Sequence, residues 1–138
     1  DKSSDFNIYI ENVFEDDPSM MKELFDDLND PRIHIALDIG HANVMTKKDI
    51  SVYDWIKILG KSIGHFHIHN NNGHNDLHSA IDNGNIDMKK IFEAIDEYCS
   101  KNVTITIESS DCESSVKWLS ENKYIWKGSN KNEWRRIV

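Results

Sequence analysis

The sequence predicts an α/β fold in which helices cover a parallel sheet. Two observations carry this prediction: short runs are rich in β-branched residues, and amphipathic helical patterns lie between those runs. Strands that alternate with helices pair in parallel through right-handed crossovers. A chain of 138 residues is long enough to bury a core and is expected to form one domain.

Four runs have the composition of strands. They lie near residues 7–11, 33–38, 63–68 and 103–108, and polar residues or glycine bound them. We expect few polar positions on either face of these strands, which is typical of a sheet with helices on both sides.

The helical patterns begin at residues suited to cap a helix. Asp17 before Pro18 is a predicted N-cap, and so is Asp87. Ser51 with Asp54 resembles a capping box, and the segment 110–113 (Ser-Asp-Cys-Glu) resembles another. Apolar residues then recur at helical spacing in four groups: Met21, Leu24, Phe25, Leu28; Val52, Trp55, Ile56, Leu59; Met88, Ile91, Phe92, Ile95, Tyr98; and Val116, Leu119.

The composition argues against several classes of protein. No apolar run approaches the roughly 20 residues of a membrane helix, and residues 1–5 do not resemble a signal peptide. Two cysteines are too few for a disulfide framework, so we expect a reducing, cytoplasmic setting with Cys99 and Cys112 buried or inert. A net charge of −8 disfavours nucleic-acid binding. One basic series is expected to form a solvated helix face: Lys123, Lys127, Lys131, Arg135 and Arg136.

Four side chains with metal-binding or acid–base capacity stand at the carboxyl ends of the predicted strands. Glu11, Asp38 and Glu108 each end a strand, and His67 lies at or near the end of the third. Ligands of parallel α/β folds bind at this edge, so one spot would receive three carboxylates and an imidazole. The carboxylates would repel one another unless a cation neutralised them. Manganese, zinc, cobalt or iron suits this set, magnesium less so; Asp38 alone could instead be a turn or cap residue.

The connection from Ile68 to Asp87 is long for a strand-to-helix loop, which is typical of functional loops and also of flexible insertions. Within it, Asp76 and His78 can point to one side of an extended segment. Together with His41 they could bind a second metal or contact substrate. The remaining histidines are expected to have no such role. We expect His65 to be hydrogen-bonded on the face of the sheet opposite His67, and His34, His69 and His74 to be solvated.

Taken together, these residues resemble the xylose-isomerase-like superfamily of TIM barrels, which includes sugar-phosphate isomerases and epimerases and the endonuclease IV repair enzymes. The resemblance runs from Ile8 to about Leu119. It rests on the motifs at residues 10–12 (Ile-Glu-Asn), 37–42 (Leu-Asp-Ile-Gly-His-Ala), 65–70 (His-Phe-His-Ile-His-Asn), 76–78 (Asp-Leu-His), 84–87 (Gly-Asn-Ile-Asp) and 107–108 (Ile-Glu). It implies a parallel (βα)4 unit, the C-terminal half of a TIM (β/α)8 barrel.

The resemblance also implies a function. Glu11, Asp38, His67 and Glu108 would bind a divalent metal such as manganese, cobalt, zinc or magnesium. In the epimerase branch the two glutamates are also acid and base, which implies isomerisation or epimerisation of a sugar or sugar phosphate through a metal-stabilised enediolate. In the endonuclease branch His41, Asp76 and His78 are further ligands, which leaves a zinc-dependent phosphodiesterase acting on abasic DNA as the alternative. A noncatalytic half-barrel is the third possibility.

The sequence departs from the family pattern at three places. Ketohexose epimerases carry an arginine where Gly73 stands, which argues against a free ketohexose as substrate. Residues 82–84 (Asp-Asn-Gly) replace the usual Gly-x-Gly, and Asn70 replaces an aspartate.

Four strand–helix units fill about half of the roughly 250 residues of a TIM barrel. Such an open sheet would expose two edges and an apolar face. We therefore expect residues 1–138 to be a single half-barrel domain from a longer protein, or to pair with an N-terminal half or a copy of itself.

Overall fold

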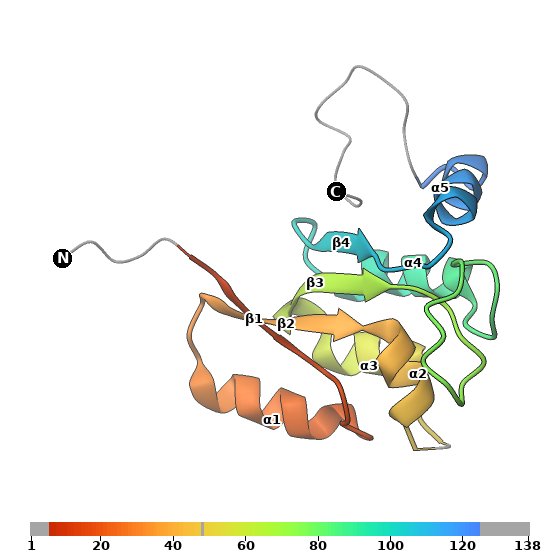
Figure 1. The fold of residues 1–138 in the computed structure, drawn as a ribbon. Helices are drawn as coiled ribbons and strands as arrows, with labels where there is room; N and C mark the ends of the chain where they lie inside the picture. Colours follow the sequence, from red (N-terminus) through yellow and green to blue (C-terminus); the bar gives the residue numbers. More distant parts are fainter. Residues whose placement is uncertain (1–5, 48, 125–138) are drawn as a thin grey trace.

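A four-stranded parallel sheet organises the chain, with helices α1, α3 and α4 along one of its sides (Figure 1). The computed structural model describes residues 6–47 and 49–124. The strands are β1 (Ile8–Glu11), β2 (Ile33–Asp38), β3 (Ile63–Ile68) and β4 (Thr104–Ile107), and they lie in the order β1-β2-β3-β4. All four predicted strands and their parallel pairing are confirmed.

The helices are α1 (Pro18–Leu28), α2 (Ile39–Met45), α3 (Val52–Leu59), α4 (Met88–Tyr98) and α5 (Cys112–Glu121), with a 3₁₀ turn, η1, at Gly60–Ser62. The predicted caps Asp17, Ser51 and Asp87 each accept a hydrogen bond from the first turn of their helix. The predicted box at 110–113 is wrong, because α5 is capped by Asp111, which accepts from the Ser114 amide.

Helix α2 was not predicted. It begins at Ile39, directly after the last residue of β2, so that two helices connect β2 to β3. Asp38 ends the strand and also caps α2, since its side chain accepts a hydrogen bond from the His41 amide. The two roles proposed for Asp38, strand-end carboxylate and cap, therefore coexist.

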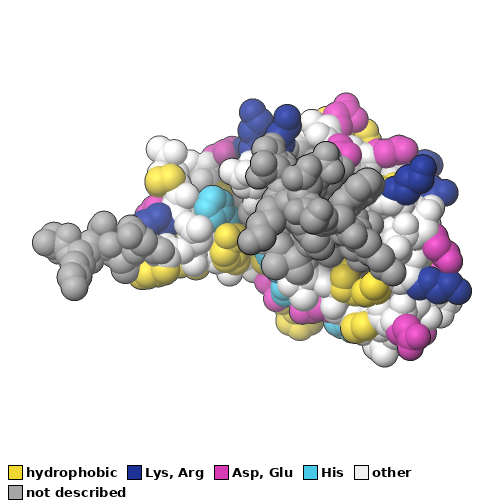
Figure 2. Space-filling view, turned by 90° about the horizontal axis from the view of Figure 1, so that it is seen from above, with side chains coloured by type: hydrophobic (Ala, Val, Ile, Leu, Met, Phe, Trp, Pro, Cys, Tyr) yellow, Lys and Arg dark blue, Asp and Glu magenta, His cyan; other side chains and the backbone are white. Residues whose placement is uncertain are grey.

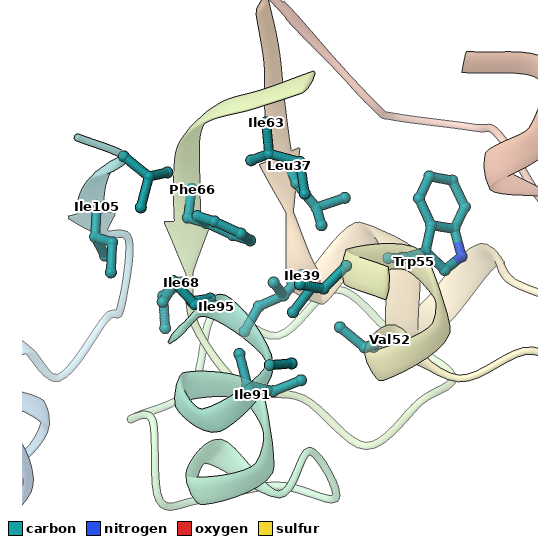
Figure 3. Packing of buried hydrophobic residues seen from close by; sticks show 14 of the residues in the cluster. Leu37, Ile39, Val52, Trp55, Ile63, Phe66, Ile68, Ile91, Ile95 and Ile105 are labelled. Atoms are coloured by element: carbon teal, nitrogen blue, oxygen red, sulfur yellow. The ribbon is translucent and has the colours of Figure 1, made fainter. Parts of the chain in front are cut away.

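The core lies between the sheet and helices α3 and α4 (Figure 3). Phe66 and Ile105 on the sheet are fully buried, as are Trp55 on α3 and its neighbour Ile56. Each such side chain contributes about 1.5–3 kcal/mol relative to an exposed one. Of the predicted apolar pattern on α1, Met21 and Phe25 are buried, whereas Leu24 and Leu28 are exposed. Val116 on α5 is exposed as well.

The opposite face of the sheet is polar, which corrects both the expectation of few polar positions and that of an exposed apolar face. Because side chains alternate along a strand, Tyr9, His34, His65, Thr104 and Thr106 share this face. The Tyr9 and His34 rings lie 5.5 Å apart, and His65 Nδ1 lies 2.6 Å from Thr104 Oγ1. This polar face leads directly to the strand ends that carry the candidate ligands.

Two remaining expectations concern the chain as a whole. No helix among the described residues is long and apolar enough to cross a membrane. In the basic series, Lys123 is exposed, whereas Lys127, Lys131, Arg135 and Arg136 lie outside the described residues.

Candidate metal centre

The side chains at the strand ends converge as the sequence predicts. His67 on β3 pairs in register with Asp38 on β2, Glu11 ends β1, and Glu108 directly follows β4. His67 Nδ1 lies 2.9 Å from Glu11 Oε1, 3.5 Å from Glu108 Oε1 and 3.9 Å from Asp38 Oδ2. These four residues are called the strand-end cluster below.

Asp38 is the buried member of the strand-end cluster. Its Oδ1 accepts hydrogen bonds from the His41 amide and from His69 Nε2, whereas its buried Oδ2 has no hydrogen-bond partner. Burial acts to raise the pKa of Asp38, but the bond from His69 and the His41 amide outweigh it, and the pKa is lowered. An ionised, buried oxygen without a partner is costly, and a cation beside it would remove that cost.

Asn12 ties the end of β1 to the end of β2. Its Oδ1 accepts from the Asp38 amide at 2.8 Å, and its Nδ2 donates to the Asp38 carbonyl at 3.0 Å. The Asn12 carbonyl accepts from His41 Nδ1 at 2.9 Å. Asn12 belongs to the Ile-Glu-Asn motif, but no role was predicted for it. Its side-chain amide holds Asp38 and its backbone carbonyl holds His41 beside Glu11.

A second group consists of His41, Asp76 and His78, and is called the loop cluster below. Asp76 Oδ2 lies 3.4 Å from His41 Nε2 and 3.1 Å from His78 Nε2. The Nδ1 of His78 donates to the Glu108 carbonyl at 2.7 Å, as that of His41 does to Asn12. A carbonyl only accepts, so both rings carry their proton on Nδ1 and, when neutral, present a lone pair at Nε2.

The loop cluster attracts positive charge. Burial acts to lower the pKa of His78, but the Glu108 carbonyl and the charge of Asp76 outweigh it, and the pKa is raised. The backbone of His78 is left-handed, with φ of 47°, and its carbonyl accepts from both the Ser110 amide and Oγ. The long loop is thereby anchored beside β4 and is not a loose insertion.

The two clusters are adjacent. His41 belongs to the loop cluster, and its Nδ1 lies 3.7 Å from Glu11 Oε1 and 3.8 Å from Asp38 Oδ2 of the strand-end cluster. A cavity of about 780 Å³ between α2, α3 and the long loop is a different place, because none of the candidate ligands lines it.

The predictions for the other histidines have mixed outcomes. His69 is fully buried rather than solvated, and its ring stacks on that of His78 with centroids 3.8 Å apart. His65 is hydrogen-bonded as predicted, to Thr104 and Thr106, but it shares a face with His67 because residues two apart on a strand point the same way. His74 is exposed as predicted, and His34 is half-buried against Tyr9.

The thiols also differ from one another. Cys99 is half-buried, and burial raises its pKa to about 12, which disfavours the reactive thiolate. Cys112 is exposed at the start of α5 rather than buried.

The donor atoms fit a divalent ion. Ligands held about 2.0–2.2 Å from one ion lie roughly 3–3.5 Å from one another. The contacts of His67 Nδ1 with the two glutamates fall in or near this range, and Glu11, Asp38 and His67 offer atoms all within 4.8 Å of one another. The loop cluster meets the same 4.8 Å criterion. Carboxylates with imidazoles form the mixed donor set of transition-metal sites.

Known proteins are similar to this chain in sequence or in fold. Residues 2–127 match the model of the xylose isomerase-like TIM barrel family. The uncharacterised protein MJ1311 of Methanocaldococcus jannaschii is 32% identical over 100 residues, which cover 72% of this chain and 33% of that protein. A D-tagatose 3-epimerase-like protein superposes with a TM-score of 0.66 at 27% identity, over 86% of this chain and 46% of its own.

Two further structures share the fold. The TTHB071 protein of Thermus thermophilus, from a crystal soaked with ZnCl2, gives a TM-score of 0.64 at 19% identity over 82% of this chain and 43% of its own. An L-ribulose 3-epimerase gives 0.58 at 20% identity over 91% of this chain and 41% of its own. This chain thus spans a third to less than half of the proteins it matches. The chain belongs to the xylose isomerase-like TIM barrel family, and its four-stranded parallel sheet is consistent with half of such a barrel.

Proposed function

We propose that this chain carries the metal-binding half of an isomerase or epimerase that acts on a sugar or sugar phosphate. The observation that carries the proposal is the placement of Glu11 and Glu108. They come from β1 and β4, the outermost strands of the sheet, yet both carboxylates approach His67 Nδ1. About a third of each side chain is exposed, so a ligand can reach them, whereas Asp38 is fully buried.

The buried and the exposed residues of the strand-end cluster would have different roles. Asp38 and His67 would hold a divalent ion together with the two glutamates. When bound, the ion would polarise the oxygens of the substrate. Glu11 and Glu108 would remove a proton from a carbon next to the carbonyl and return one, since two carboxylates near one carbon provide both a base and an acid. An epimerase-like protein among the structural relatives supports this chemistry.

The backbone at Gly73 bears on the substrate. Gly73 has φ of 76°, and a Cβ there would lie 2.8 Å from Asn85 Nδ2. A long side chain at this position is therefore strained, so the arginine of ketohexose epimerases has no counterpart here. We infer that the substrate is a sugar phosphate, or a sugar other than a free ketohexose.

Solvent-proton exchange tests the proposal. The intact chain, loaded with Mn²⁺, is incubated in D2O with a panel of ketoses and ketose phosphates, and deuterium at carbon is followed by NMR. Glu11→Gln and Glu108→Gln should each abolish exchange, whereas the exposed Glu113→Gln on α5 should not change it. Exchange that persists in Glu108→Gln would refute the proton-transfer role; no exchange by the metal-loaded wild-type chain would favour a noncatalytic half-barrel.

We also propose that residues 1–138 form one domain whose site is completed by a further half-barrel, in the same protein or in a second copy. Among the described residues, β1 and β4 each have a single neighbour in the sheet, and Leu24 and Leu28 on α1 are exposed. Light scattering after size exclusion tests self-association: a dimer would support pairing of copies, and a well-folded monomer would argue against it.

The loop cluster supports one alternative, a zinc-dependent phosphodiesterase acting on abasic DNA. Such an enzyme would use His41, Asp76 and His78 beside the strand-end cluster. The net charge of −8 counts against it, and acidic and basic side chains of the described residues are interspersed on the face drawn in Figure 2. Three bound zinc ions per chain, measured by elemental analysis, would favour the phosphodiesterase, and a single manganese or cobalt ion would favour the isomerase.

A further inference from the structure

His69 joins the two clusters, although it belongs to neither. Its side chain is fully buried directly after β3. His69 Nε2 lies 3.1 Å from Asp38 Oδ1 in the strand-end cluster and 3.6 Å from Asp76 Oδ1 in the loop cluster. Its ring lies parallel to that of His78, with 9° between the planes. The His69 imidazole thus contacts one carboxylate of each cluster and also the His78 ring of the loop cluster.

The space for this ring depends on Gly40 in α2. A Cβ at Gly40 would lie 1.9 Å from His69 Cε1, so no larger residue at this position is compatible with the ring as placed. The other ring nitrogen, Nδ1, is buried and has no hydrogen-bond partner. The polar contacts of His69 are therefore made by Nε2 and are directed at the two carboxylates.

The contact with Asp38 decides which of its oxygens is available. Since an ionised carboxylate only accepts, His69 Nε2 carries the proton and donates it to Oδ1. Because Oδ1 also accepts a hydrogen bond from the His41 amide, Oδ2 has no hydrogen-bond partner and lies on the side of His67. A rotation of the Asp38 carboxylate away from this orientation would break both bonds.

We propose that His69 is a positioning residue. It holds Asp38 so that Oδ2 alone faces the strand-end cluster. Through its contacts with Asp76 and the His78 ring, it also fixes the position of the loop cluster relative to the strand-end cluster. This inference rests on the proposed metal site. A donor behind a ligating carboxylate fixes its orientation, and loss of such a partner typically lowers metal affinity about 10- to 100-fold.

Two substitutions separate the hydrogen bond from the bulk of the ring. His69→Gln places an amide N–H near the position of Nε2, whereas His69→Leu fills similar space without a donor. Calorimetric titration of the intact chain with Mn²⁺ should show affinity close to wild type for His69→Gln and about 10- to 100-fold weaker for His69→Leu. His74→Leu, in the same loop but exposed, is the matched control and should bind like wild type. The absorption spectrum of bound Co²⁺ should change in His69→Leu and not in the control.

The outcomes distinguish this inference from the proposed function. Equal affinity of His69→Leu and wild type would overturn the positioning role, while the metal site would stand. Equal affinity of Asp38→Asn and wild type would instead overturn the strand-end site, and His69 would lose its role with it. If His69→Leu does not fold, His69→Asn replaces it, because the shorter amide does not reach Asp38 Oδ1; equal affinity of the Gln and Asn variants would then overturn the proposal.

Discussion

Replacing Gly40 with alanine reverses the usual expectation for a glycine in a helix. Gly40 lies in α2 and is buried, and helix propensity alone would make alanine more stable by about 1 kcal/mol. In this chain the added methyl would lie 1.9 Å from His69 Cε1. Carbon atoms in contact lie about 3.5–4.0 Å apart, so the buried ring would have to move by more than about 1 Å.

The cost follows from two parts of this displacement. Overpacking a filled interior costs about 1–3 kcal/mol, and the hydrogen bond from His69 to the charged Asp38 contributes about 1.5–3 kcal/mol. After the gain in helix propensity, Gly40→Ala should lower the free energy of unfolding by roughly 2–5 kcal/mol.

Urea unfolding followed by tryptophan fluorescence measures this change, and a double-mutant cycle assigns its cause. In a His69→Ala background the methyl has room, so Gly40→Ala should be neutral or slightly stabilising. A cost that is the same in both backgrounds, or a stabilised single variant, would refute the steric explanation.

Three further predictions concern other parts of the molecule. Asn12→Ala removes two buried hydrogen bonds to the Asp38 backbone and should lower the free energy of unfolding by about 2–4 kcal/mol; a loss below about 1 kcal/mol in urea unfolding would show that the strand ends do not depend on it. Iodoacetamide at pH 8 should alkylate Cys112 well before Cys99, whose pKa of about 12 keeps the thiol protonated; equal rates by peptide mass mapping would contradict this. Mn²⁺ at about 100 times its Kd should stabilise the chain by about 2.7 kcal/mol, and a chelator should reverse the rise in Tm; an unchanged Tm would count against a folded-state site.

Local signals in the sequence account for the elements that were predicted correctly. The β-branched runs at 33–38 and 63–68 form strands of the sheet. Asp17, Ser51 and Asp87 cap helices through contacts within three residues of the sequence. The convergence of Glu11, Asp38, His67 and Glu108 follows from one rule, because the carboxyl ends of neighbouring parallel strands meet at the same edge.

What the sequence did not predict depends on contacts between distant segments. The burial of His69 requires the gap at Gly40, 29 positions earlier, in a helix that starts without a break after β2. The polar face of the sheet had a local signal that was missed, since residues 65, 67 and 69 follow the period of two that places side chains on one face. The link from His78 to the Glu108 carbonyl depends on a left-handed residue, which no local pattern indicated.

An anomalous difference map from crystals of the intact chain grown with Mn²⁺ tests the central claim most directly. The claim is that Glu11, Asp38, His67 and Glu108 together bind one divalent ion. We predict a single strong peak among Asp38 Oδ2, His67 Nδ1 and the two glutamate carboxylates, and its loss in Asp38→Asn. A map with no peak at these atoms at saturating Mn²⁺, or with an unchanged peak in Asp38→Asn, would contradict the claim.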